Sequence, residues 1–230
     1  MCGRYYLDVI LRDLMEWYDI ENTNIHYVPR YNIAPTQYAP VILGGERRQL
    51  HLFRWGLIPA WSKDLAIGQK MINARSETLT EKASFREAFR KRRCIVPAGG
   101  FYEWDKSRGK KIPYRFYLKN RPILSMAGLW DLWQSPEGEK IYSFAIITTE
   151  PNDTIAPYHH RMAALLDPDE EALWLDQNIQ GEKLLSSLLK PYAGEPLEKQ
   201  RVSEAVNAVR NDFAALLYPD EESVQLKLDL

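Results

Sequence analysis

The stretch RCIVPAGGFYEW, residues 93–104, decides the fold class of this 230-residue chain. Its apolar run 94–97 predicts a buried strand, and Gly99-Gly100 predicts a bend into a second strand at 101–104. The apolar setting of Cys94 indicates an inert, buried thiol. Glu103 is the one carboxylate of the stretch and lies among aromatic residues, so we expect it to be partly desolvated.

Short strand-like and helix-like runs continue on both sides of this stretch. Apolar, β-branched and aromatic residues predict strands at 38–43, 50–57, 114–118, 123–129, 142–148 and, as an edge strand, 223–230. Apolar residues at helical spacing predict helices at 8–18, 84–93, 168–176 and 182–189. Asp8 is the expected N-cap of the first helix, and Phe85 and Phe89 are spaced to share the buried side of the second. Residues 22–37, rich in Asn, Pro and Tyr, predict an extended loop.

Together these elements predict an α+β fold. Many short strands with few, short helices are typical of a curved, barrel-like and mostly antiparallel sheet. No repeat, low-complexity tract or linker divides the chain, so we expect a single domain over residues 1–230. Residues 208–230 are expected to pack on that domain.

Composition excludes several classes of protein. Apolar residues make up 45% and charged residues 27% of the chain, the balance of an ordinary water-soluble protein. No apolar run reaches the ~18–20 residues of a membrane span, and the N-terminus lacks the pattern of a secretory signal. Two cysteines do not make a disulfide framework. We therefore expect a reduced, cytoplasmic protein with no membrane partner.

The net charge of −1 hides an asymmetry between the two halves. Residues 1–120 carry a net charge of +9 and residues 121–230 carry −10. The basic residues concentrate in the run 85–93 and again at Lys106, Arg108, Lys110, Lys111 and Arg115. Each run alone is most often a solvated face, but two runs beside aromatic residues favour a polyanionic partner.

The N-terminal sequence Met1-Cys2-Gly3-Arg4 carries a reactive group if Met1 is removed, as is usual before a small residue. Cys2 then offers an α-amine and a thiol on neighbouring carbons, which close on an aldehyde to give a five-membered thiazolidine. An α-amine has a pKa of about 7.7–8.0, against about 10.4 for lysine, so far more of it is neutral near pH 7. A cysteine after Met1 also occurs by chance, so other segments must support this interpretation.

Four other regions supply polar groups in loop or strand-end settings. They are 30–37 (RYNIAPTQ) with 54–61 (RWGLIPAW), 72–78 (INARSET), 93–104, and 158–162 (YHHRM). No CxxC pair, metal-like histidine spacing or glycine-rich nucleotide loop occurs, so we expect no metal and no cofactor.

In this order, with the Met-Cys-Gly-Arg start, these segments resemble the SRAP (SOS response-associated peptidase) family. The resemblance runs from residue 2 to about residue 207, where 202–203 and 206–207 match the family's last motif. It implies an SRAP fold, single-stranded DNA binding and covalent thiazolidine capture of abasic sites. By motif position it implies an active site of Cys2, Asn73, Glu103 and His159.

The residue chemistry is compatible with these roles. Desolvation of Glu103 would raise its pKa and let it shuttle protons. His159 could move protons on the sugar, although its neighbour His160 offers the same chemistry. Asn73 could orient the amine or a sugar oxygen. The chain departs from the family at residues 159–163, HHRMA, where the family has an acidic residue second and a proline last.

For DNA contact the sequence nominates cations beside catalytic positions and aromatic residues able to stack on bases. The cations are Arg4, Arg75, Arg86 and Arg161, and the aromatic residues are Trp55, Trp61 and Trp104. We expect a monomer that recognises single-stranded DNA containing abasic sites, shields the lesion, and is nucleoid-associated when bound.

Other functions remain compatible with the same residues. A thiol peptidase would use Cys2 as nucleophile, His159 as base and Asn73 as orienter, with release of Met1 as one autocatalytic cut. A non-covalent single-strand binding module would need only the basic half and the tryptophans. A lyase acting through the same imine would cleave the strand instead of retaining it.

Overall fold

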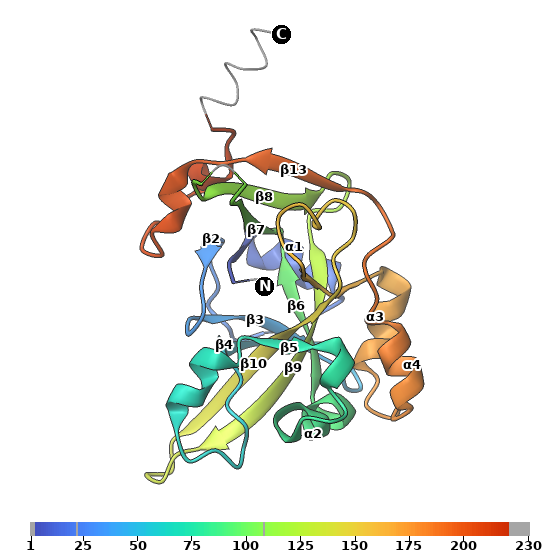
Figure 1. The fold of residues 1–230 in the computed structure, drawn as a ribbon. Helices are drawn as coiled ribbons and strands as arrows, with labels where there is room; N and C mark the ends of the chain where they lie inside the picture. The colour runs from blue at the N-terminus through green and yellow to red at the C-terminus, as the bar shows by residue number, and fades with distance from the viewer. Residues whose placement is uncertain (1–2, 22, 108, 221–230) are drawn as a thin grey trace, which may run out of the picture.

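The computed structural model describes residues 3–21, 23–107 and 109–220 of the chain. Five of its strands close into a mixed barrel (Figure 1). Within this ring only β4 and β10 run parallel, and the other neighbouring pairs are antiparallel. The strands are β3 (Tyr38–Leu43), β4 (Gln49–Trp55), β6 (Arg93–Ala98), β9 (Leu124–Gln134) and β10 (Lys140–Thr149). The predicted α+β fold with a barrel-like, mostly antiparallel sheet is confirmed.

Three short strands extend the barrel at one end. β5 (Asn73–Arg75) runs parallel to β10, β11 (Met162–Ala163) pairs with the end of β10, and β12 (Leu165–Leu166) pairs with β9. The end of β10 is therefore a meeting point, because Thr148 lies opposite both Arg75 and Ala163.

A second, antiparallel sheet of five strands lies against the barrel (Figure 1). Its order is β13 (Leu197–Arg201), β8 (Ile112–Leu118), β7 (Gly100–Asp105), β1 (Tyr5–Leu7) and β2 (Arg30–Ile33). The chain passes from barrel to sheet at Gly99-Gly100, as the bend in the sequence predicts. Added Cβ atoms there would lie 2.2 Å from Asp8 Oδ1 and 2.4 Å from the Phe116 carbonyl oxygen, so only glycine fits.

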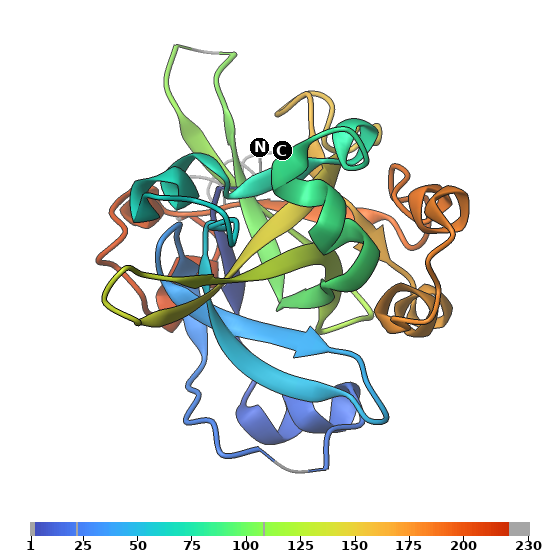
Figure 2. The same cartoon turned by 90° about the horizontal axis from the view of Figure 1, so that it is seen from below.

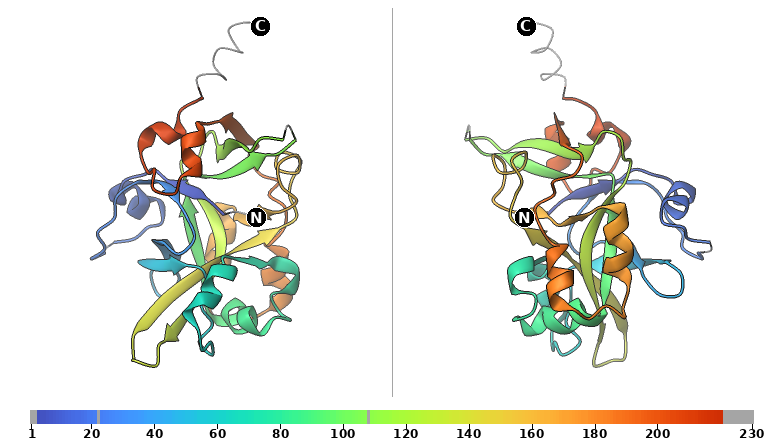
Figure 3. Two further views of the ribbon diagram at one scale, coloured as in Figure 1. Left: turned by 60° about the vertical axis from the view of Figure 1, so that its left-hand side comes forward. Right: turned by 90° about the vertical axis from the view of Figure 1, so that its right-hand side faces the viewer.

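Short helices surround the two sheets. The α-helices are α1 (Leu11–Trp17), α2 (Ala83–Lys91), α3 (Pro168–Leu175) and α4 (Glu182–Ser187). The 3₁₀ turns are η1 (Leu65–Lys70), η2 (Ser76–Thr78), η3 (Glu204–Asn207) and η4 (Ala214–Leu217). Helices α3 and α4 lie side by side, away from α1, and the β7–β8 hairpin projects from the body (Figures 2 and 3).

Two local predictions need correction, and one cannot be assessed. Helix α1 begins at Leu11 with Ile10 in the N-cap position, and the Asp8 carboxyl lies instead beside Gly99 at the sheet junction. The segment 22–37 is not only a loop, since residues 30–33 form β2 against β1. The edge strand expected at 223–230 lies outside the described residues.

The packing explains which surfaces are available for function. One apolar cluster fills the barrel and includes Phe85, Phe89 and Cys94, as the sequence predicts, and burial raises the pKa of the Cys94 thiol. A second, smaller cluster joins Tyr6 and Tyr102 to Val202, Val206, Leu216 and Leu217, fastening the C-terminal part of the described chain to the five-stranded sheet. No described helix is both long and apolar enough to cross a membrane.

Candidate active site and nucleic-acid interface

Glu103 lies in β7 with its side chain inside the molecule. It is 6% exposed, and burial raises the pKa of its carboxyl to about 7. Its cross-strand partner is Tyr114 of β8, so the two side chains share one face of the sheet. A carboxyl with this pKa is present in both protonation states near neutral pH and can accept and return a proton.

The loop between β10 and β11 brings His159 to the face of the sheet that carries Glu103. The ring of Tyr158 packs against Tyr114 and Phe116 of β8, with centroid distances of 5.1 and 5.0 Å. Since Tyr114 lies opposite Glu103, the loop that holds His159 faces the carboxyl. Both groups also lie within electrostatic reach of Lys106.

His159 is held as a neutral ring. His159 Nδ1 faces the main chain of Arg161, 3.0 Å from its nitrogen and 3.1 Å from its carbonyl oxygen, so the turn at 159–161 fixes the orientation of the ring. Burial lowers the pKa of His159 to about 4, and positive charge on His160 and Lys106 acts in the same direction. His160 stacks on His159 at 4.3 Å but is exposed, so His159 is the better placed of the two. A neutral imidazole carries one donor nitrogen and one acceptor nitrogen, and with this pKa it is a weak base.

Asn73 lies on a short strand at the end of the barrel where the loop that holds His159 begins. It begins β5 and lies opposite Ile146 of β10, two residues before the point where β5, β10 and β11 meet. Arg161 bonds to the main chain at that point, through Thr148. The strand of Asn73 and the loop of His159 are therefore joined through the end of β10.

Cys2 lies outside the described residues. The first described contact of this region is from the Tyr102 N–H to the Arg4 carbonyl oxygen, at 3.0 Å. It places Arg4 beside the residue that precedes Glu103.

A pocket of about 400 Å³ opens beside Glu103. Its other lining residues are Trp104, Lys106, Lys111 and Asn207, and the Trp104 indole donates to Asn207 Oδ1 at 2.7 Å. Two cations, an indole and an amide suit a nucleic-acid strand, which needs phosphate contacts and a stacking surface. A larger hollow of about 800 Å³, between Gly44-Gly45 and α3, contains none of the predicted site residues.

One predicted DNA contact is wrong. Trp55 has no exposed surface, its indole donates to the Ile72 carbonyl oxygen at 2.9 Å, and its ring packs on Tyr5 and Phe144. An indole that closes the barrel core in this way has no face left for a base.

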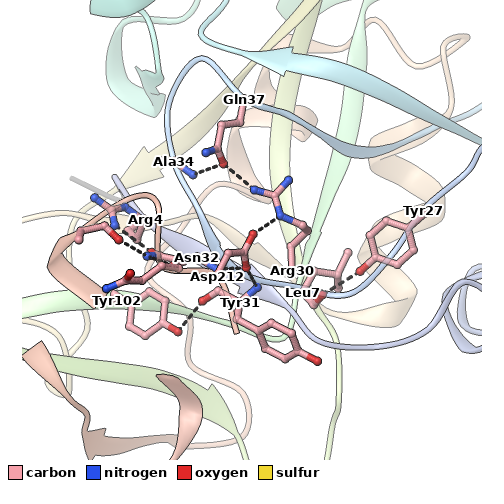
Figure 4. Close-up of polar contacts among 12 residues, drawn as sticks. Arg4, Leu7, Tyr27, Arg30, Tyr31, Asn32, Ala34, Gln37, Tyr102 and Asp212 are labelled. Atoms are coloured by element: carbon pink, nitrogen blue, oxygen red, sulfur yellow. Dashed lines mark hydrogen bonds and ion pairs between the residues drawn. The ribbon is translucent and has the colours of Figure 1, made fainter. Parts of the chain in front are cut away.

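Two predicted phosphate ligands are engaged inside the protein. Arg161 is 8% exposed, pairs in bidentate fashion with Glu77 at 2.6 and 2.9 Å, and donates to the Thr148 carbonyl oxygen. It therefore anchors the His159 loop, which corrects its assignment as a phosphate ligand. Arg4 Nη1 donates to Asn32 Oδ1 and to the Val206 carbonyl oxygen, each at 2.8 Å (Figure 4). Its role as a phosphate ligand stays a prediction and now competes with an internal one.

The remaining nominations are accessible. Arg75 and Arg86 are exposed, Trp61 is 59% exposed, and Trp104 borders the pocket. Sequence reasoning missed the part that Tyr158 and Asn207 play in building the site. Asn207 belongs to the motif at 206–207, but only the tertiary fold brings it to Trp104. Among the described residues no group of three or more His, Cys, Asp or Glu side chains could hold a metal ion.

Residues 1–209 match the sequence profile of the family described as SOS response associated peptidase (SRAP). The chain belongs to this family. It is 42% identical over 221 residues to the abasic site processing protein YoaM of Bacillus subtilis, covering 94% of this chain and 97% of the relative. It is 35% identical over 231 residues to the abasic site processing protein HMCES of Gallus gallus, covering 86% of this chain and 68% of the relative.

The fold is similar to that of solved structures. A crystal structure of a Bacteroides thetaiotaomicron protein matches with a TM-score of 0.86 at 30% identity, covering 95% of this chain and all of that one. A protein from Bordetella bronchiseptica matches with a TM-score of 0.75 at 27% identity, covering 88% of this chain and all of that one.

Proposed function

We propose that the protein captures abasic sites in single-stranded DNA by forming a thiazolidine between Cys2 and the sugar aldehyde. The observation that supports this most directly is the buried carboxyl of Glu103, whose pKa is about 7. It lies in β7, and the preceding residue of that strand, Tyr102, donates its N–H to the Arg4 carbonyl oxygen. The names of the relatives, which process abasic sites, point to the same substrate. In this proposal the adduct shields the lesion from strand cleavage.

The proposed reaction needs only proton transfers from the protein. The neutral α-amine of Cys2 adds to the aldehyde carbon, the resulting hydroxyl leaves as water, and an imine remains. The thiolate then adds to the imine carbon and the nitrogen takes up a proton, so the overall change is loss of one water. Glu103 accepts the proton from the attacking amine and returns one to the departing hydroxyl. The Nε2 of His159 hydrogen-bonds to a sugar hydroxyl, and Asn73 orients the amine or a sugar oxygen.

The strand would lie across the pocket beside Glu103. Lys106 and Lys111 neutralise phosphates, Trp104 and Trp61 offer indole faces to bases, and Arg75 extends the contact. Contacts of this kind are directed to the backbone and to stacking, so we expect little sequence preference and strong salt dependence.

The thiol peptidase alternative is less well supported. A general base for Cys2 should have a pKa near the working pH, whereas burial lowers the pKa of His159 to about 4. N-terminal acetylation separates the two functions, because it blocks imine formation and leaves the thiol nucleophile intact.

Intact-protein mass spectrometry with an abasic oligonucleotide tests the proposal. We expect a product equal to the protein without Met1, plus the oligonucleotide, minus one water. Cys2→Ala, or any residue retained ahead of Cys2, should abolish it, while Lys183→Ala, at an exposed position of α4, should leave it intact. A full yield of adduct from Cys2→Ala would overturn the mechanism, and accumulation of cleaved strand in place of adduct would favour the lyase.

A further inference from the structure

The segment 204–212 lies against the beginnings of β1 and β2 (Figure 4). Two motifs meet there that the proposed chemistry leaves without a role, at residues 30–37 and 202–207. The contacts between them are polar, and the buried polar groups at this junction satisfy one another by hydrogen bonds.

Asn32 is the centre of these contacts. It has no exposed surface, and its Oδ1 accepts from Arg4 Nη1 at 2.8 Å. Its Nδ2 lies 2.7 Å from the carbonyl oxygen of Asn211 and 3.2 Å from those of Val206 and Ala208. One amide therefore connects the guanidinium of Arg4 to three main-chain carbonyl groups of the C-terminal segment.

Only an amide satisfies these partners at this position. The oxygen faces a cation and the nitrogen faces carbonyl oxygens, so the side chain needs an acceptor at one tip and a donor at the other. A carboxylate of the same shape would turn an oxygen toward three carbonyl oxygens. Alanine would take a donor from all three, although the Val206 and Ala208 oxygens keep the Arg4 guanidinium and the Asn211 N–H.

Asp212 fixes the main chain of β2 around Asn32. Its Oδ1 accepts from the N–H groups of Tyr31 and Asn32, at 2.5 and 3.1 Å, and its Oδ2 pairs with Arg30. Arg30 Nη2 in turn donates to Gln37 Oε1 at 2.9 Å. Asn32 is thus held both by its main-chain N–H and by its side-chain amide.

The same group of residues contacts both neighbours of Glu103. The Tyr102 hydroxyl donates to the Tyr31 carbonyl oxygen at 2.8 Å, and Trp104 donates to Asn207 Oδ1. The Tyr102 N–H donates to the Arg4 carbonyl oxygen. Arg4, which follows Cys2 by two residues, is therefore fixed relative to the strand that carries the proposed acid–base group.

We propose that Asn32 and Asp212 are positioning residues for the covalent reaction. They hold Arg4 so that the chain just before it presents the amine of Cys2 to an aldehyde at the Glu103 face. This inference rests on the proposed function and adds a geometric requirement to it. Misplacing reactive groups by about 1 Å can cost on the order of 100-fold in rate.

The test compares Asn32→Asp and Asp212→Asn with the unchanged protein and a matched control. The control is Asp220→Asn, which removes an ion pair with Arg201, 2.9 Å long, in the same C-terminal region but away from Asn32. Three quantities are measured for each: adduct rate at saturating abasic oligonucleotide, affinity for an oligonucleotide carrying a tetrahydrofuran abasic analogue, and adduct rate with propanal.

We expect Asn32→Asp to lower the saturating rate roughly 10–100-fold, with smaller losses for Asp212→Asn and none for Asp220→Asn. Affinity for the tetrahydrofuran oligonucleotide and the rate with propanal should stay within about twofold, because neither depends on where the amine is held. Melting curves identify variants that are folded at the assay temperature. If Asn32→Asp is not folded there, Asp212→Asn, which changes a partly exposed carboxylate, provides the test.

Two results would overturn the inference while leaving the proposed function intact. One is a saturating rate equal to that of the unchanged protein, and the other is an equal loss with propanal, which would indicate altered amine reactivity. Absence of any adduct from the unchanged protein would instead defeat the proposed function, and the positioning role with it.

Discussion

The stretch FREAFRKRR at residues 85–93 and the stretch KSRGKK at residues 106–111 both concentrate positive charge in the basic half of the chain. In sequence they suggest the same thing, a surface for a polyanion. In the structure one lies along α2 and β6 at the barrel, and the other lies in the β7–β8 hairpin (Figures 1 and 2).

The cations of the first stretch are used mainly to hold the fold together. Arg93 is 2% exposed, and its guanidinium donates to five carbonyl oxygens, those of Phe89 and Arg90 in α2, Trp174 and Asp176 at the end of α3, and Ile179 in the loop that follows. The first four are carbonyls that a helix leaves unsatisfied at its C-terminus, where a positive charge is also favoured. Arg90 pairs with Glu182, Arg92 with Asp131, and Lys91 with Glu87.

The cations of the second stretch remain available. Lys106, Lys110 and Lys111 are exposed, and within the described residues no carboxylate lies at ion-pair distance from them. Two of the three line the pocket beside Glu103. Local charge density is therefore a poor guide to a binding surface, because carboxylates and helix ends distant in sequence decide which cations are free.

The largest difference that we expect between the two stretches is in their contribution to the free energy of unfolding. Arg93→Met should lower the free energy of unfolding by roughly 3–5 kcal/mol, since several buried carbonyls lose their donor at about 1–3 kcal/mol each. Arg86→Met, at an exposed position of the same stretch, should change it by less than about 0.5 kcal/mol. Urea denaturation measures both, and a loss below about 1 kcal/mol for Arg93→Met would remove the contrast.

The next effect is on DNA affinity. Replacing Lys106, Lys110 and Lys111 by alanine should weaken binding to a tetrahydrofuran oligonucleotide roughly 10–50-fold at low salt. It should also reduce the slope of log K against log salt by about 2, at about 0.7 per phosphate contact on a single strand. The matched triple replacement of Arg86, Arg90 and Lys91 should weaken binding by less than about threefold. Equal losses in the two triple variants would show that both stretches bind DNA.

The same contrast applies to two tryptophans that lie six residues apart. Trp61 is exposed, so Trp61→Ala should weaken single-strand binding by roughly 5–10-fold, within the range for loss of one stacked base, with little change in melting temperature. Trp55→Phe should lower the melting temperature and leave single-strand binding nearly unchanged, because the Trp55 indole donates to the Ile72 carbonyl oxygen inside the barrel. Fluorescence anisotropy and thermal melting together distinguish the two outcomes.

The smallest effect concerns pH. Adduct formation should depend on a group with a pKa of about 7, that of Glu103, which burial raises from its usual value. The positive charge of Lys106 opposes that rise, so Lys106→Ala should raise the pKa of Glu103 further and move the inflection to higher pH. Because Lys106 is exposed and acts through solvent, the shift should be less than about one pH unit. A shift to lower pH, or an equal shift in Arg86→Ala, would contradict the assignment of the inflection to Glu103.

Local patterns were sufficient to predict most regular elements. The strands around 94–97, 101–104, 114–118 and 142–148, and the buried Phe85 and Phe89, follow from apolar spacing over a few residues. Strand β2 was not predicted because its four residues, set among asparagine, proline and tyrosine, are too short to show an alternating pattern. Its strand conformation depends on hydrogen bonding to β1. Asp8 is not the N-cap because α1 begins only at Leu11, and the Asp8 carboxyl lies beside Gly99, about 90 residues away in the sequence.

The sequence by itself determined the α+β class, the apolar burial of Cys94, the setting of Glu103 among aromatic residues, and the family to which the chain belongs. All of these depend on residue types and short spacings, which need no knowledge of distant partners. Only the tertiary structure decided that Trp55 and Arg161 face inward and that the Arg93 guanidinium bonds the ends of two helices. It also decided that Asn32 bonds to Arg4 and that Asp212 bonds to β2. Whether a polar or aromatic side chain is buried and satisfied depends on groups that the fold brings together from far along the chain, and no local pattern contains that information.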